Sequence, residues 1–192
     1  MLEVWPVKFP GCEPVAHRLR ATFPARWVRF HNLPGSKRYP DDQDEYATAL
    51  GRQNRILDEL VGGEASIILL TTEYSRPPST VEIPPVTELR SIDRGAKPWR
   101  SVPMHDLDEK FDEPSYWHVF ASESAWRPGV LDPVLMLVAD DVIANVMILP
   151  PSCRWLFHPY DGGMDLILET SADRDRLRSS HADWLSPRPD GM

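Results

Sequence analysis

Cysteine, long apolar runs and positive charge are all scarce in this chain. Only two of its 192 residues are cysteine, and Cys12 and Cys153 form neither a metal-type pair nor a disulfide framework. No stretch approaches the roughly 18 consecutive apolar residues of a membrane-spanning helix, and the N-terminus lacks the basic start and apolar run of a signal peptide. We therefore expect a reduced cytoplasmic protein with two free thiols and no membrane contact.

Basic residues are outnumbered by acidic ones, which bears on the partners of the protein. The chain has 21 Lys and Arg against 29 Asp and Glu, a formal net charge of −8. Nucleic-acid binding requires a positive field over the phosphates, so this balance opposes it, whereas it favours solubility. The charge balance therefore argues against a nucleic acid as partner. The predicted partners are another protein or a small anionic ligand, and no membrane is expected.

The common catalytic motifs are missing as well. The sequence has neither of the glycine-rich phosphate loops, and it lacks the HExxH, CxxC and GxSxG patterns. Their absence does not exclude an enzyme, but it removes the motifs that identify one. The catalytic residues are therefore unknown at this stage, and no cofactor and no metal is predicted.

Proline, by contrast, is abundant, with 20 residues, and it indicates how the chain is organised. Because proline lacks the N–H group and has a fixed φ, it marks segments that are neither helix nor central strand. Prolines recur through residues 1–25, which we interpret as an irregular, proline-rich N-terminal arm over the core, with Trp5 and Phe9 as anchors. Residues 26–186 then form a single α+β domain, and residues 187–192 form a tail.

The remaining pattern predicts a sheet with two main helices. The first helix, 42–61, begins at the capping residue Asp42 and ends at Gly62-Gly63, and the second spans 172–185. Residues 99–104 are a weaker candidate for a short edge strand. The predicted fold class is α+β, an antiparallel or mixed sheet of about five to six strands with these helices packed on one side. Apolar or alternating runs predict the strands at 26–33, 65–73, 116–122, 143–149, 154–159 and 164–169.

A basic strip supplies the first candidate ligand-binding residues. Residues 17–40 contain six Lys or Arg and no acidic residue, in a chain that is acidic overall. Arginine binds carboxylate or phosphate in a two-pronged fork, so a strand and loop of this charge could hold an anion. The alternative is that the strip pairs with the acidic residues at 41–45 and 106–113. The candidates in the strip are Arg29, His31, Lys37 and Arg38.

A single histidine, His118, is the second candidate. It lies in the aromatic stretch SYWHVF, where Tyr116 and Phe120 share its face of a predicted strand. A neutral imidazole near pH 7 can serve as a general base or a ligand. The alternative interpretation is a hydrogen-bonded core histidine.

The stretch HPYDGGMD at residues 158–165 is the third candidate. It places His158, Asp161 and Asp165 on the two sides of one predicted hairpin turn. Two carboxylates and an imidazole could bind a divalent metal or perform acid–base chemistry. The alternative is structural, because Asp-Gly-Gly is also what a tight turn requires. Asp161 suits that turn, whereas Asp165 lies on the strand beyond it and needs either solvent or a partner. We therefore expect Asp165 and His158 to be more available to a ligand than Asp161.

Several stretches together resemble a widespread bacterial domain-of-unknown-function family of roughly this length. They are RFHNLPGSKRYPDDQDEYA, PSYWHVF, WRPGVLDP and LFHPYDGGMDLIL, followed by HADWLSPRPDGM. The resemblance spans about residues 25–190 and leaves residues 1–24 outside. In that family HPYDGGMD is a characteristic signature. The resemblance implies a complete, free-standing member and carries over no activity.

These observations leave three functions open. The leading hypothesis is a binding module that recognises a protein or an anionic ligand, with Arg29, His31 and the 158–165 hairpin as its surface. The alternative is a small hydrolase or phosphate-ester enzyme that uses His118, His158, Asp161 and Asp165 as acid–base groups or ligands. A further alternative is an immunity-type protein that neutralises a toxin with its acidic surface.

Overall fold

A computed structural model describes residues 2–75, 87–107 and 114–188 of the chain. The helices are α1 (Trp5–Lys8), α2 (Ala16–Thr22), α3 (Gln43–Val61), α4 (Thr87–Ile92), α5 (Asp132–Ala139) and α6 (Ser171–Ser180). The strands are β1 (Trp27–His31), β2 (Ser66–Ser75), β3 (Lys97–Pro103), β4 (Tyr116–Ala125), β5 (Met147–Leu149), β6 (Leu156–Tyr160) and β7 (Gly163–Ile167). No helix within these residues is long and apolar enough to cross a membrane.

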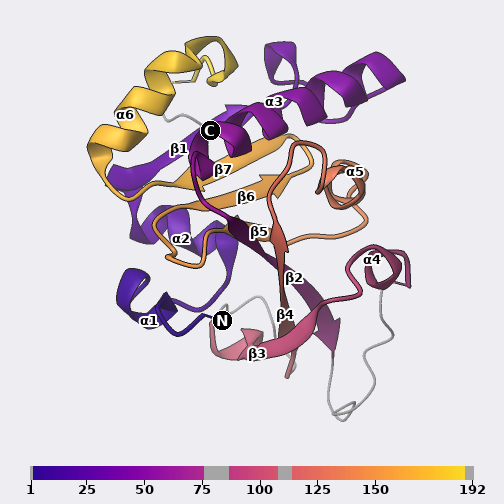
Figure 1. Cartoon of the computed structure of the whole chain (residues 1–192), viewed down its shortest axis with the longest axis vertical. Coiled ribbons are helices and arrows are strands. Elements are labelled where there is room, and N and C mark those ends of the chain that lie inside the picture. Colours follow the sequence, from indigo (N-terminus) through magenta and orange to yellow (C-terminus); the bar gives the residue numbers. More distant parts are fainter. Residues whose placement is uncertain (1, 76–86, 108–113, 189–192) are drawn as a thin grey trace.

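The described strands form one antiparallel sheet in the order β1-β7-β6-β5-β2-β4-β3. Figure 1 shows it running from β1, beside α3 and α6, to β3 at the opposite edge. The fold class α+β is confirmed, but the predicted five to six strands are wrong, because the sheet has seven in the described residues. The strand missing from the main prediction is β3. It contains Pro98 and Pro103, and proline is tolerated there because an edge strand leaves one row of N–H groups unpaired.

Local sequence signals explain where helix α3 begins and ends and why strand β5 is short. Asp42 caps α3, since its carboxylate accepts a hydrogen bond from the Glu45 N–H at 2.9 Å. Gly62 ends the helix with φ 57°, a conformation that glycine adopts without strain. Strand β5 is shorter than the predicted 143–149, because Asn145 has φ 54° and interrupts the extended backbone.

Helices cover both faces of the sheet, in contrast to the predicted one-sided packing. On one face α3, α5 and α6 pack against Phe30, Phe157 and Leu166. On the other face the first residues of the chain pack against Ile68, Leu70 and neighbouring apolar side chains. Strand side chains alternate between the faces, so each strand contributes to both clusters.

The N-terminal arm is less irregular than its prolines suggested. It contains α1 and α2, and Trp5 and Phe9 are buried on the sheet as anchors. Asn145 fixes the start of α2, because its side-chain oxygen accepts a hydrogen bond from the Ala16 N–H at 2.8 Å and its amide donates to the Pro14 carbonyl at 3.0 Å. Both cysteines are free thiols, as predicted.

Candidate functional site

A cavity of about 680 Å³ opens on the face of the sheet that carries α2. It lies where β1 and β6 end and β7 begins, between α2, the β6–β7 turn and the segment 141–145 that precedes β5. Its lining includes six residues that the sequence analysis singled out, and they come from three strands, one turn and one loop. They are Arg29, His31, Arg38, His158, Asp161 and Asp165.

Strand pairing explains why distant residues meet here. Asp165 of β7 lies opposite Arg29 of β1 on one side and opposite His158 of β6 on the other. Directly opposed residues in antiparallel strands point to the same face, so the three side chains form a row across the sheet. His31 follows two residues after Arg29 and shares that face.

The row is centred on a buried ion pair. Arg29 donates from Nε to Asp165 Oδ1 and from a terminal nitrogen to Oδ2, both at 2.7 Å, in the two-pronged geometry that arginine and carboxylate favour. Their side chains are only 11% and 6% exposed. Arg20 of α2 approaches the same carboxylate at 3.9 Å. Asp165 therefore has protein partners, whereas the sequence had suggested a carboxylate available to a ligand.

The β6–β7 turn holds the second carboxylate. Asp161 Oδ1 accepts a hydrogen bond from the Gly162 N–H at 2.8 Å, and Oδ2 accepts one from Arg38 Nε at 2.6 Å. Position 163, directly after this turn, requires glycine because no side chain fits there. A Cβ at this position would lie 2.2 Å from the Phe30 carbonyl oxygen. Asp161 thus builds the turn and also orients Arg38 at the cavity.

His158 has a defined tautomer at the buried end of the cavity. Its Nδ1 lies 2.7 Å from the Val146 carbonyl oxygen, which can only accept, so Nδ1 carries the proton. Burial lowers the pKa of His158 below its usual value, which keeps the ring neutral near pH 7. Nε2 is then a lone-pair acceptor, the form that a general base requires.

Two further polar groups at this end have a buried atom without a partner within the described part of the chain. They are Nε2 of His31 and the hydroxyl of Tyr160. Burial, together with the nearby Arg29 charge, lowers the pKa of His31, so this ring is neutral as well. Burial also raises the pKa of Tyr160 well above its usual value, which keeps the phenol protonated.

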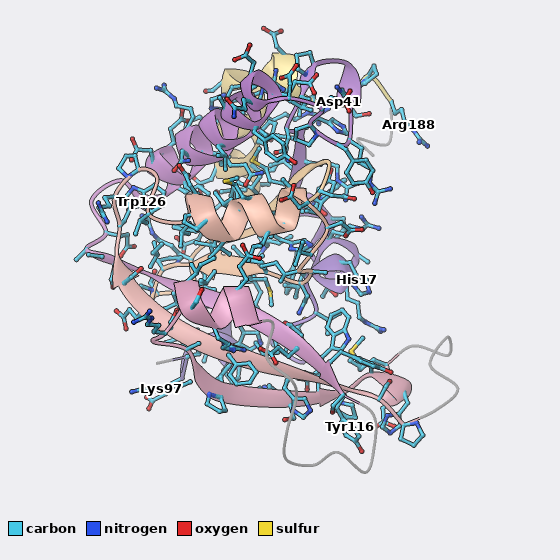
Figure 2. The ribbon with its side chains drawn as sticks, turned by 90° about the vertical axis from the view of Figure 1, so that its right-hand side faces the viewer. His17, Asp41, Lys97, Tyr116, Trp126 and Arg188 are labelled. Carbon is cyan, nitrogen blue, oxygen red and sulfur yellow. The ribbon has the colours of Figure 1, made fainter. Side chains whose placement is uncertain are left out.

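The rim of the cavity includes residues that the sequence did not single out. His17 and Arg20 come from α2, and Arg188 comes from the other end of the chain. Figure 2 shows His17 and Arg188 on the same side of the molecule, away from Trp126. The available signal was the i, i+3 spacing of His17 and Arg20, which places both on one helix face once α2 is accepted as a helix.

The charge of the cavity is opposite in sign to that of the chain. Four arginines line it, at positions 20, 29, 38 and 188, against three aspartates, at 141, 161 and 165. With histidines counted as neutral in both cases, the difference, 4 − 3, is +1, whereas the whole chain carries −8. The cavity is therefore a local site of positive charge.

Two of the sequence candidates lie elsewhere. His118 does not line the cavity, although its neighbour Trp117 on β4 does. The His118 ring is hydrogen-bonded on both sides, with Nε2 2.8 Å from the Ser75 hydroxyl and Nδ1 2.8 Å from the Ser101 hydroxyl. Lys37 forms ion pairs with Asp41 and Glu45, which is the pairing with residues 41–45 considered above. Of the other acidic stretch, 106–113, residues 108–113 lie outside the described residues.

A metal site at the hairpin finds no support in the donor geometry. Asp161 and Asp165 are each bound by an arginine, and no three His, Cys, Asp or Glu side chains in the described residues are grouped as metal ligands.

The model of the family described as Domain of unknown function (DUF3885) matches residues 15–189. The chain belongs to this family. The DUF3885 match begins next to α2, so it includes every cavity residue discussed above. No curated protein and no solved structure matches the chain.

Proposed function

We propose that the cavity binds a small anionic ligand and that the protein is a ligand-binding module. The observation that carries this proposal is the set of four arginines around one cavity in a chain of net charge −8. Guanidinium groups recognise phosphate and carboxylate oxygens through paired N–H donors. The volume of about 680 Å³ suits a small molecule, because ligand pockets generally enclose about 300–1,000 Å³. A concave site of this size favours a small ligand over a protein partner.

Arg20 is the arginine best placed to receive the ligand. It lies 3.9 Å from Asp165, whose carboxylate is already held by Arg29 at 2.7 Å. Its charge therefore exceeds what the buried pair requires. Arg38 is more exposed but is bound to Asp161, so it supports the ligand while also anchoring the turn.

Isothermal titration with inorganic phosphate, pyrophosphate and citrate tests this function. We expect at least one of these anions to bind, and Arg20→Gln to weaken its affinity about tenfold, roughly the ~1.4 kcal/mol of one charged contact. Arg178→Gln is the matched control, because Arg178 lies on α6 and does not line the cavity. Absence of binding by all three anions, or equal losses in both variants, contradicts the proposal.

A second candidate function is phosphate-ester hydrolysis, favoured by His158 alone. Its neutral Nε2 is placed to take a proton from an attacking water molecule, while Asp161 and Asp165 are bound to arginines. His118 takes no part in this version, since it lies outside the cavity. Release of nitrophenol from nitrophenyl phosphate should fall about 100-fold or more in His158→Gln. Equal rates in the two proteins would exclude this function.

We also propose that HPYDGGMD is a signature of the family because it builds the floor of this cavity. Its histidine, tyrosine and two aspartates line the cavity, and its second glycine permits the close approach of β1 to the turn.

A further inference from the structure

The two ends of the cavity differ in exposure. At the rim, the Arg38 and Arg20 side chains are 65% and 33% exposed. At the floor, His158 is only 9% exposed and the Arg29–Asp165 pair is almost completely buried. A ligand that fills the cavity therefore meets solvated cations at one end and a desolvated polar floor at the other.

The floor carries no net charge. Arg29 and Asp165 neutralise each other in a two-pronged pair. The remaining polar groups, His31, His158 and Tyr160, are neutral near pH 7 for the reasons given above. The excess positive charge of the site consequently lies with the arginines of the rim.

The chemistry of His158 disfavours an anion beside it. In His158 the Nδ1 proton is used by the Val146 carbonyl, so Nε2 can only accept a hydrogen bond. A phosphate dianion or a carboxylate has no proton to donate, and its lone pairs would oppose that of Nε2. An alcohol hydroxyl has a proton to donate, so it can satisfy this imidazole acceptor.

Nε2 of His158 is the acceptor that the floor offers to a ligand, because His158 lines the cavity and its Nδ1 is already bonded to the Val146 carbonyl. The His31 Nε2 and the Tyr160 hydroxyl also lack a partner within the described residues, but both atoms are fully buried, so a molecule in the cavity does not contact them.

From this difference between floor and rim we propose that the ligand is a hydroxylated organic phosphate, such as a sugar phosphate. One of its hydroxyl groups donates to Nε2 of His158 on the floor, and its phosphate lies at the rim against Arg20 and Arg38. This inference rests on the proposed anion-binding function and adds the class and orientation of the ligand. A cavity of about 680 Å³ is large enough for a monosaccharide phosphate.

Calorimetric titration with methyl phosphate, ribose 5-phosphate and glucose 6-phosphate tests the inference, because the three carry the same phosphate charge and differ in hydroxyl groups. We expect at least one sugar phosphate to bind about tenfold or more tightly than methyl phosphate. His158→Phe, which removes the imidazole acceptor, should reduce that advantage about threefold to tenfold and leave methyl phosphate binding unchanged. Arg20→Gln should weaken all three ligands by a similar factor.

The outcomes separate the two proposals. Equal affinity for methyl phosphate and both sugar phosphates, still sensitive to Arg20→Gln, overturns the ligand class and leaves anion binding intact. No binding of any phosphate overturns both. If His158→Phe folds with an unchanged far-ultraviolet spectrum but keeps the sugar-phosphate advantage, the proposed orientation is wrong.

Discussion

The buried pair of Arg29 and Asp165 makes Asp165→Asn the most informative stability variant. The substitution keeps the size of the side chain and removes its charge. One of the two hydrogen bonds from Arg29 can still reach the amide oxygen, but the guanidinium, 11% exposed, is left without its counter-ion. Losing one partner of a buried ion pair is generally more costly than losing the whole pair, because the remaining charge stays desolvated.

The structure allows an estimate of the loss. Removing one member of a buried pair costs about 3–5 kcal/mol. Here the lower end applies, because the Tyr160 ring lies 4.7 Å from the guanidinium carbon of Arg29 and continues to stabilise the cation. We therefore expect a loss of about 3 kcal/mol, which for a chain of this length lowers the melting temperature by roughly 6–12 °C.

Urea unfolding of wild type, Asp165→Asn, Arg29→Met and the double variant Arg29→Met/Asp165→Leu measures this loss. The double variant should recover most of the stability, since apolar replacement of a whole buried pair is often neutral. Asp41→Asn, whose side chain is 80% exposed beside Lys37, is the control and should leave the midpoint nearly unchanged. If Asp165→Asn is as stable as wild type, Asp165 is not the structural centre of the cavity. The expectation from the sequence, a carboxylate available to a ligand, is then the better description.

Three further predictions follow from the same region. Asn145→Ala should lower the free energy of unfolding by about 2–4 kcal/mol and expose the N-terminal arm to proteases, because it removes the side-chain hydrogen bonds to Ala16, Pro14 and Thr72. Asn145→Gly removes the same hydrogen bonds but tolerates the φ of 54°, so comparing the two variants separates the two costs. Gly163→Ala should cost at least about 2 kcal/mol in chemical unfolding, since its Cβ would meet the Phe30 carbonyl oxygen at 2.2 Å, whereas Gly63→Ala, with open space around it, should not. The pKa of His158 is lowered in the folded state, so the unfolded chain takes up the proton first as the pH falls below about 6.5, and stability is lost in that range. His158→Phe should therefore flatten the decline of the urea midpoint between about pH 7 and pH 5, and an unchanged slope would show that His158 does not contribute to it.

Much of the fold follows from local sequence signals. Asp42 begins α3 through its side-chain hydrogen bond, and Gly62 ends it through its positive φ. Asp161 defines the β6–β7 turn, because its carboxylate accepts a hydrogen bond from the Gly162 N–H. Strand β3 escaped the main prediction because Pro98 and Pro103 argue against any strand unless its position at the edge is known. That position is a property of the whole sheet and is not encoded locally.

The candidate site was predictable only in part, for a similar reason. Alternation along a strand places Arg29 and His31 on one face, and the hairpin brings His158 and Asp165 together. The pairing of β1 with β7 joins these two sets, and residues more than 130 positions apart in sequence meet through it. His17 was missed because it lies in an arm whose prolines obscured a helix of seven residues.

The folded unit begins earlier in the chain than the family match, because it includes the N-terminal arm. The family match begins at residue 15, yet Leu2, Trp5 and Phe9, all before it, are buried against the same sheet face as Leu19. Each such side chain contributes about 1.5–3 kcal/mol by leaving water. A chain begun at residue 15 would keep the whole family sequence and every residue of the cavity, but it would expose an apolar surface and lose the Pro14 carbonyl that helps hold α2. A shortened version of this protein should therefore retain residues 2–14, which cover the sheet although they lie outside the family match.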